Sequence, residues 1–220
     1  MKICGMSLEQ IKEQLHHASY DDLFLMLKQQ EEQLESEISI MKGNLSTVRR
    51  FADNIKRLNN IPALDHVIYE YIPERRIETF ESDIDFFQLG YFGYELMLRE
   101  FKSYMIRNSL PLSYFFNAGT LMGKDSFIKG EYRANNVFLF VDDNYPSSPS
   151  VITLPQNLHM TIYAEDISKE HIYARKLMDE ITSAGFSPCG DYLCEPISHM
   201  SYEEENKRFL TYRIQVPVSR

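Results

Sequence analysis

The feature that most constrains this chain is an apolar seam with heptad spacing. Apolar side chains recur at intervals of 7, 4, 3, 4, 3, 4 and 3 residues, at Leu27, Leu34, Ile38, Met41, Leu45, Val48, Ala52 and Ile55. This spacing is the a/d pattern of a coiled coil. No proline interrupts it, so the sequence predicts one helix over residues 20–58, roughly 58 Å long at 1.5 Å per residue.

Such a helix is longer than a domain of 220 residues can cover with its own core. One alternative is a core helix of a single globular domain, and the other is a seam that packs on the same helix of a second subunit. The length favours the second alternative. We therefore expect a homodimer whose contacts are made by Leu34, Ile38, Met41, Leu45, Val48 and Ile55.

The composition changes after Asn59-Asn60 and Pro62, which end the predicted helix. Residues 1–18 are predicted to contain a short helix that starts at Ser7. We divide the chain into this segment, a dimerisation helix over residues 19–60 and a folded domain over residues 61–220.

The folded domain shows the order strand, helix, strand, strand twice. The predicted strands are 67–71, 75–80, 112–117, 136–141, 158–164, 191–197 and 209–218, and the predicted helices are 86–108 and 169–184. The sequence thus predicts an α+β fold in which a duplicated β-α-β-β unit forms one antiparallel sheet with two helices on one face. The opposite face is then a concave surface that suits a ligand.

Charge and motif content exclude several functions. A net charge of -9 opposes binding to nucleic acid phosphates. Three cysteines without zinc-ligand spacing, and six histidines without a His-x-x-x-His pair, predict reduced thiols, no metal and no cofactor. The absence of a long apolar run predicts a cytoplasmic protein without membrane contact. No phosphate loop or nucleophile elbow occurs, so we expect no catalytic residues.

Two stretches resemble known families. Ile3 to Lys12 resembles the segment after the winged helix in MerR-family transcription regulators. Leu154-Pro155, Gly185, the run Gly190 to Glu195 and the closing strand 209–218 resemble the GyrI-like effector-binding domain of the multidrug-sensing branch. The resemblance covers essentially the whole chain in order.

This resemblance implies the effector-sensing and dimerisation portion of a MerR-like regulator. Residues 1–18 would be the tail of the DNA-binding region, and promoter DNA would be bound only through an upstream helix-turn-helix that is absent from this chain, by truncation or by natural loss. The effector would be a small lipophilic or cationic molecule. The alternatives are a stand-alone GyrI-like binding protein and a hydrolase of reactive toxins, although the aromatic cleft of such hydrolases includes tryptophan and this chain has none.

Glu195 is the first candidate ligand-binding residue, because it lies in a predicted strand between apolar neighbours. A buried carboxylate is costly unless it is paired, and a lipophilic cation is one partner. The family resemblance also implies a buried glutamate among aromatic side chains, and alignment on Pro196 places Tyr192 at that position. The alternative is an ordinary carboxylate of an edge strand or turn.

Strand alternation selects the aromatic candidates. In the last strand Phe209 shares the cleft face with Thr211, Arg213 and Gln215, whereas Tyr212, Ile214 and Val216 face the helices. Tyr163 shares the more polar face of its strand with His159 and Thr161. Phe138 and Phe140 share one face, which alternation does not identify. For each of these aromatic residues the alternative to a ligand contact is a place in the core.

Overall fold

The structure, a computed structural model, describes residues 8–9, 19–115, 118–197, 202–204, 207–209 and 211–220. Its longest element is helix α2 (Tyr20–Leu58), which has the bounds predicted from the heptad seam. The helix begins with a capping box, because the Ser19 side chain accepts from the Asp22 N–H and the Asp22 carboxylate accepts from the Ser19 N–H. It ends at Leu58, and Asn59 is its C-cap residue, two residues before Ile61-Pro62.

The domain that follows α2 is α+β, as predicted. Its strands are β1 (Val67–Ile72), β2 (Arg75–Glu81), β3 (Gly119–Met122), β4 (Asn136–Val141), β5 (Val151–Leu154), β6 (Asn157–Ala164), β7 (Ser187–Pro188), β8 (Tyr192–Pro196), β9 (Tyr202–Glu204), β10 (Lys207–Phe209) and β11 (Tyr212–Ser219). Its helices are α3 (Phe86–Arg107), α4 (Lys124–Lys129) and α5 (Glu170–Ser183), with 3-10 turns η2 (Leu112–Tyr114) and η3 (Ile167–Lys169).

The main sheet has the strand order β1-β6-β11-β8-β3-β4-β2-β5, with β7 paired to β11, and its pairs are antiparallel. The duplicated unit is visible in this order. The first unit is β2, α3, β3 and β4, and the second is β6, α5, β8 and β11. The two units meet at their β3 and β8 strands, so the order of one half mirrors the order of the other.

The β1–β6 pair at one end of the sheet and the β2–β5 pair at the other end form one continuous ladder. Strand β1 precedes β2 in the chain but pairs with β6, whereas β5 precedes β6 but pairs with β2. Ile72 pairs with Asn157 and Arg75 pairs with Leu154, so the same register runs through both pairings. Pro73 and Pro155 lie in the gap, where proline has no N–H to donate to a ladder. The sheet is therefore curled, and each half receives a strand from the other.

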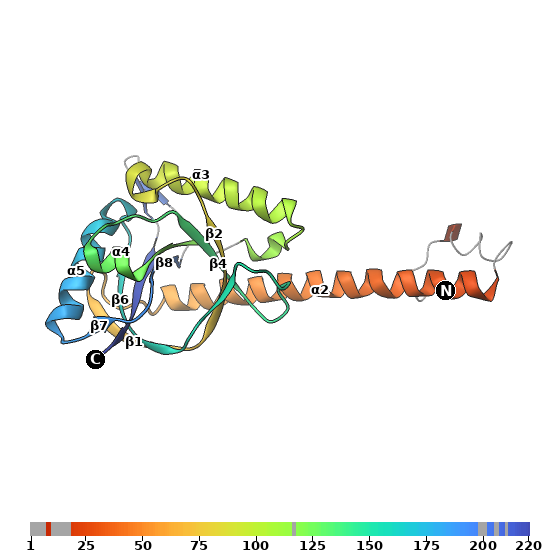
Figure 1. The fold of residues 1–220 in the computed structure, drawn as a ribbon, viewed down its shortest axis with the longest axis horizontal. Coiled ribbons are helices and arrows are strands. Elements are labelled where there is room, and N and C mark those ends of the chain that lie inside the picture. Colours follow the sequence, from red (N-terminus) through yellow and green to blue (C-terminus); the bar gives the residue numbers. More distant parts are fainter. Residues whose placement is uncertain (1–7, 10–18, 116–117, 198–201, 205–206, 210) are drawn as a thin grey trace.

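Helices α3 and α5 lie on one face of this sheet (Figure 1). Val137 and Cys194 both pair with Thr120, so they share a face, and Val137 packs with α3 whereas Cys194 packs with α5. Tyr212, Ile214 and Val216 pack against α5, as strand alternation predicted. Gly119 lies where the two units meet, and a Cβ there would clash with the Cys194 carbonyl oxygen.

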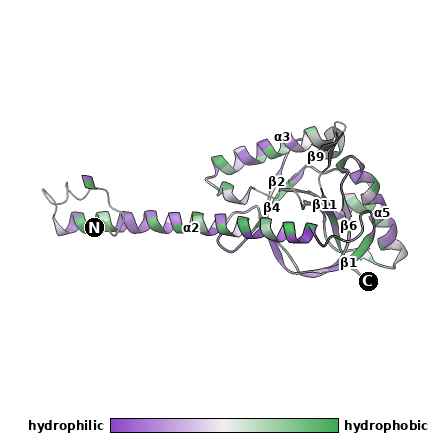
Figure 2. Ribbon diagram, turned by 180° about the vertical axis from the view of Figure 1, so that it is seen from behind, coloured by the Kyte–Doolittle hydropathy of each residue, from purple (hydrophilic) through white to green (hydrophobic). Residues whose placement is uncertain are grey.

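Helix α2 has two different faces. The face opposite the a/d seam contacts the domain through residues spaced seven apart, namely Gly43, Arg50 and Arg57. Gly43 is buried against Ser113 and Tyr114. The seam itself is exposed, for example 66% at Met41 and 64% at Val48. The part of α2 before Gly43 projects from the domain (Figure 1), and apolar and polar residues alternate along it (Figure 2).

Two predicted segments differ from the structure, and a third lies largely outside the described residues. Within the strand predicted over residues 112–117, Leu112–Tyr114 form the 3-10 turn η2, because Pro111 begins a tight turn. The strand of this unit is β3. The strand predicted over residues 209–218 begins only at Tyr212, since Phe209 pairs with Tyr202 in a separate two-stranded sheet. The helix predicted within residues 1–18 lies largely outside the described residues.

Among the described helices, none combines the length and the apolar character needed to cross a bilayer.

Candidate functional site

A cavity of about 680 Å³ lies between α2 and the concave face of the sheet. One wall is the kinked strand segment 70–76, and a second is the end of β4 with the residues after it, 140–143. Helix α2 contributes Ser46, Arg50, Asp53 and Arg57, and the sheet contributes Glu195 and Arg213. This volume falls within the range of about 300–1,000 Å³ that is typical of small-molecule pockets.

Glu195 forms the centre of the cavity floor and is almost fully buried, with 5% of its side chain exposed. Its Oε2 accepts from Arg213 Nη2 at 2.6 Å and from Gln215 Nε2 at 3.0 Å. Its Oε1 accepts from Arg57 Nη1 at 3.0 Å, and Arg75 Nη1 lies 4.0 Å from Oε2. The carboxylate thus joins α2 to the two halves of the curled sheet.

The ion-pair network extends from Glu195 to strand β1. Arg213 Nη1 lies 3.3 Å from Glu70 Oε2, and the Tyr163 hydroxyl donates to Glu70 Oε1 at 3.1 Å. Arg75 Nη2 donates to the Gln215 side-chain oxygen at 2.8 Å. These groups meet because Arg213 pairs directly with both Glu195 and Tyr163 across the sheet.

Burial and neighbouring charges together shift the pKa values of Glu195, Arg75 and His159. Burial raises the pKa of Glu195, but the attraction of Arg213, Arg57 and Arg75 outweighs burial and lowers it to about 2. Burial lowers the pKa of Arg75 to about 10, and repulsion from Arg213 and Arg57 acts in the same direction. Burial also lowers the pKa of His159 to about 4, so this side chain is neutral at pH 7.

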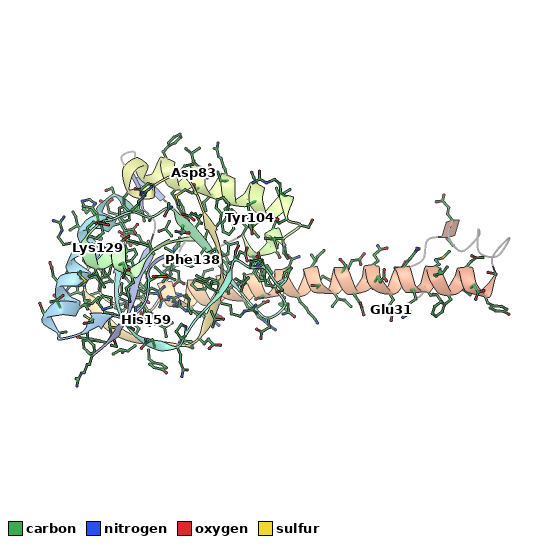
Figure 3. All side chains as sticks on the ribbon, in the orientation of Figure 1. Glu31, Asp83, Tyr104, Lys129, Phe138 and His159 are labelled. Carbon is green, nitrogen blue, oxygen red and sulfur yellow. The ribbon has the colours of Figure 1, made fainter. Side chains whose placement is uncertain are left out.

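The apolar part of the cavity is formed around Phe140. The Arg75 guanidinium lies 5.1 Å from the centroid of the Phe140 ring, and the Phe138 ring stands edge-on to it at 5.2 Å. Phe138 belongs to a small core cluster with Ile77, Leu121 and Leu193. Figure 3 shows Phe138 inside the domain, far from Glu31 on the projecting part of α2. Phe140 therefore offers an aromatic surface beside a cluster of arginines.

The structure brings together only some of the predicted site residues. Glu195 and Phe140 line the cavity, Phe138 packs behind Phe140, and Tyr163 reaches the site through Glu70. Tyr192 is corrected: strand alternation places it on the opposite face, fully buried in the core, where its hydroxyl donates to Glu170 at 2.8 Å. Phe209 is corrected too, because β10 is separate from the main sheet.

Sequence reasoning placed Arg213 and Gln215 on the cleft face but missed their role, and it missed Arg57 and Arg75 altogether. Arg57 lies 138 positions before Glu195 in the chain, and no local spacing connects them. One signal was present: Arg57 is seven residues after Arg50 and fourteen after Gly43, on the side of the predicted helix opposite the seam.

The protein thus has a projecting helix joined to a duplicated α+β domain, and this domain has a charged cavity on its concave face. The fold, a long N-terminal helix with a curled antiparallel sheet, is the α+β architecture predicted from the sequence. Neither the protein-family models nor the curated protein sequences contain a match.

Several solved structures are similar. EcmrR in its DNA complex aligns with a TM-score of 0.51 and 12% identity, over 100% of this chain and 80% of that chain. The C-terminal domain of EcmrR aligns with a TM-score of 0.49 and 14% identity, over 70% and 98%. A hydrolase from Listeria innocua aligns with a TM-score of 0.45 and 9% identity, over 74% and 97%. At 12% identity, the likeness to EcmrR shows a shared fold.

Proposed function

We propose that this chain is the effector-sensing and dimerising portion of a cytoplasmic MerR-like transcription regulator. The observation that carries the proposal is the two-faced helix α2: one face has the exposed heptad seam, and the opposite face inserts Arg57 into the ion pair with Glu195. One rigid element thus joins a surface for a second subunit to the floor of the cavity. The fold shared with EcmrR, a MerR-family regulator seen bound to DNA, supports the assignment.

In this proposal a small molecule with a lipophilic part occupies the cavity and contacts α2 directly. Arg50 and Arg57 of α2 line the cavity together with Phe140 of β4. A ligand that changes the Arg57–Glu195 contact changes how α2 sits on the sheet, and the helix transmits that change along its length. A helix-turn-helix joined to the N-terminal side of α2 would contact the promoter.

We propose binding and not hydrolysis, because Glu195 is a poor general base. A general base works best when its pKa lies near the working pH. Burial raises the pKa of Glu195, but three arginines lower it to about 2, far from neutral pH. The same arginines occupy both carboxylate oxygens, so an attacking water would have to displace them.

The first test concerns the seam. Replacing Leu34, Met41 and Val48 together with glutamate places like charges face to face in a coiled coil, so we expect a monomer where the unchanged chain is a dimer. Sedimentation equilibrium gives the mass of each. The matched control replaces Gln29, Ser36 and Ser39 with glutamate, because these exposed positions add the same charge to α2 outside the seam. A dimer in the seam variant, or a monomer in the unchanged chain, contradicts the proposal.

The second test concerns the cavity. A chemically varied library of small aromatic compounds is screened by thermal unfolding, and the hits are titrated into the Phe140→Ala variant. We expect hits with micromolar affinity that weaken about tenfold or more in this variant, since it removes the aromatic wall. Phe92→Ala is the control, because Phe92 is exposed on α3 across the sheet. A library without hits, or hits whose affinity is the same in Phe140→Ala, would show that the cavity is not an effector site.

A further inference from the structure

The cavity floor has more positive than negative charge. Three guanidinium groups, of Arg57, Arg75 and Arg213, surround Glu195, and Glu70 is the second carboxylate of the network. His159 is neutral at pH 7 and adds no charge. The floor therefore has a net charge of about +1 before any ligand enters.

Two of these arginines have hydrogen-bonding capacity left over. Arg213 Nε and Arg75 Nε are buried and find no hydrogen-bond partner within the described part of the chain, and the same holds for Thr161 Oγ1. Only 8% of the Arg213 side chain is exposed. Each unpaired buried N–H costs free energy, so these guanidinium groups have donor capacity that Glu195 does not use.

The acidic residues at the cavity rim do not cancel this excess on the floor. Asp143 is 99% exposed and lies 3.3 Å from Arg76, and Asp53 is exposed beside Lys56. Asp142 accepts from the Tyr114 hydroxyl at 2.6 Å, and Glu74 is exposed. Water and salt screen exposed charges far more than buried ones, so the buried arginines dominate the potential at the floor.

We infer that the cavity takes an amphipathic anion: a carboxylate or similar acidic group beside Arg75 and Arg213, and a flat apolar body against Phe140. This inference names the ligand class for the function proposed above and rests on it. It reverses the expectation of a lipophilic cation, because Glu195 already has its positive partners in the protein. A cation would enter beside three arginines, whereas an anion neutralises the excess charge.

Three probes with one ring system separate charge from shape. They are 2-naphthoate, 2-naphthamide and 2-naphthamidine, which are an anion, a neutral molecule and a cation of nearly equal size. By titration calorimetry at neutral pH, we expect naphthoate to bind about tenfold more tightly than naphthamide, the gain expected for hydrogen bonds to a charged group. Naphthamidine should bind most weakly.

Variants then locate the charge. Arg75→Gln should weaken naphthoate about tenfold and change naphthamide less than about twofold, whereas Arg75→Lys, which keeps the charge, should retain the preference for the anion. The control is Arg99→Gln, which removes the same charge from an exposed position on α3, across the sheet. Thermal unfolding confirms that each variant is folded before it is titrated.

Each outcome decides the inference. The order naphthoate, naphthamide, naphthamidine with loss in Arg75→Gln supports it. A reversed order, equal affinities, or no naphthoate binding at millimolar concentration overturns it, and so does an equal loss in Arg99→Gln. A reversed order leaves the effector site standing, because the library screen with Phe140→Ala tests that proposal separately.

Discussion

Glu170 is a buried carboxyl outside the cavity, at the start of α5. It is 1% exposed and accepts from the Tyr192 hydroxyl within the core between α5 and the sheet. Burial raises its pKa to about 7, although the hydrogen bonds from Tyr192 and Cys194 act in the opposite direction. The folded protein thus keeps a proton on Glu170 at a pH where an unfolded chain has released it.

This difference makes stability depend on pH in a defined direction. Between pH 4.5, the ordinary pKa of the group, and about 7, the unfolded state binds fewer protons than the folded state, so stability falls as pH rises. Relative to Glu170→Gln, which cannot titrate, we expect the wild type to lose roughly 2 to 3 kcal/mol of unfolding free energy over this window. Urea unfolding at several pH values measures the loss.

The control for this measurement is Glu180→Gln, the same substitution at an exposed position of α5. It should leave the pH dependence of the wild type unchanged. Parallel stability curves for wild type and Glu170→Gln would show that Glu170 is ionised in the fold throughout this range.

Single residues were predicted from the sequence only where local alternation decided their place. Alternation placed Tyr212 toward α5 and Arg213 toward the cleft, because successive side chains of a strand face opposite ways. It could not reveal that Glu195 has arginine partners, since Arg57 and Arg75 reach it from distant segments. A pattern that ends within one strand contains no information about such long-range pairs.

At the scale of elements, α2 was predicted with bounds close to the observed Tyr20–Leu58, because its signal is periodic and long. The short elements were not. Strand β3 has four residues and α4 has six, which is too few to show a period. The 3-10 turn η2 was wrongly predicted as a strand because it lies in a short apolar segment with Leu112 and Phe115, where no regular period separates turn from strand. The duplicated unit was still recognised, because α3 and α5 have clear helical spacing.

Helix α2 is held to the domain through a close approach at Gly43. A Cβ at this position would lie 3.0 Å from Ser113 Oγ and 3.1 Å from Tyr114 Cε2. Gly43→Leu must therefore push α2 away from η2, and we expect it to destabilise the fold by roughly 1 to 3 kcal/mol. Urea unfolding measures the effect.

Ser36→Leu is the comparison for this substitution. Ser36 lies one heptad earlier on the same side of α2, where the helix is exposed. A leucine there should change stability by less than about 0.5 kcal/mol. Leucine is a better helix former than glycine or serine, so helix propensity alone would raise stability at both positions. An unchanged or raised stability in Gly43→Leu would therefore show that contact with η2 does not decide the result.

At the scale of the whole molecule, the proposed dimer would make stability depend on concentration. A projecting helix with little tertiary support is marginal in water, and in the proposed dimer a second subunit supports α2. Association that is specific to the folded state stabilises by mass action. We expect the melting temperature of the wild type to rise by several degrees over about a hundredfold range of protein concentration.

Scanning calorimetry at a series of concentrations tests this expectation. The variant with glutamate at Leu34, Met41 and Val48 should melt at one temperature throughout the series. A wild type that behaves in the same way would mean that the fold is complete in a single chain.

The single ladder formed by β1–β2 and β5–β6 has a consequence for the integrity of the domain. Because β1 pairs with β6 and β5 pairs with β2, the strand that precedes each repeat in the chain pairs with the first strand of the other repeat. Cleaving the backbone in the exposed turn at residues 143–144 would give two fragments, neither of which contains both partners of this ladder. Such fragments are expected to recover their structure only on mixing, because each fragment supplies one strand of each pair in this ladder.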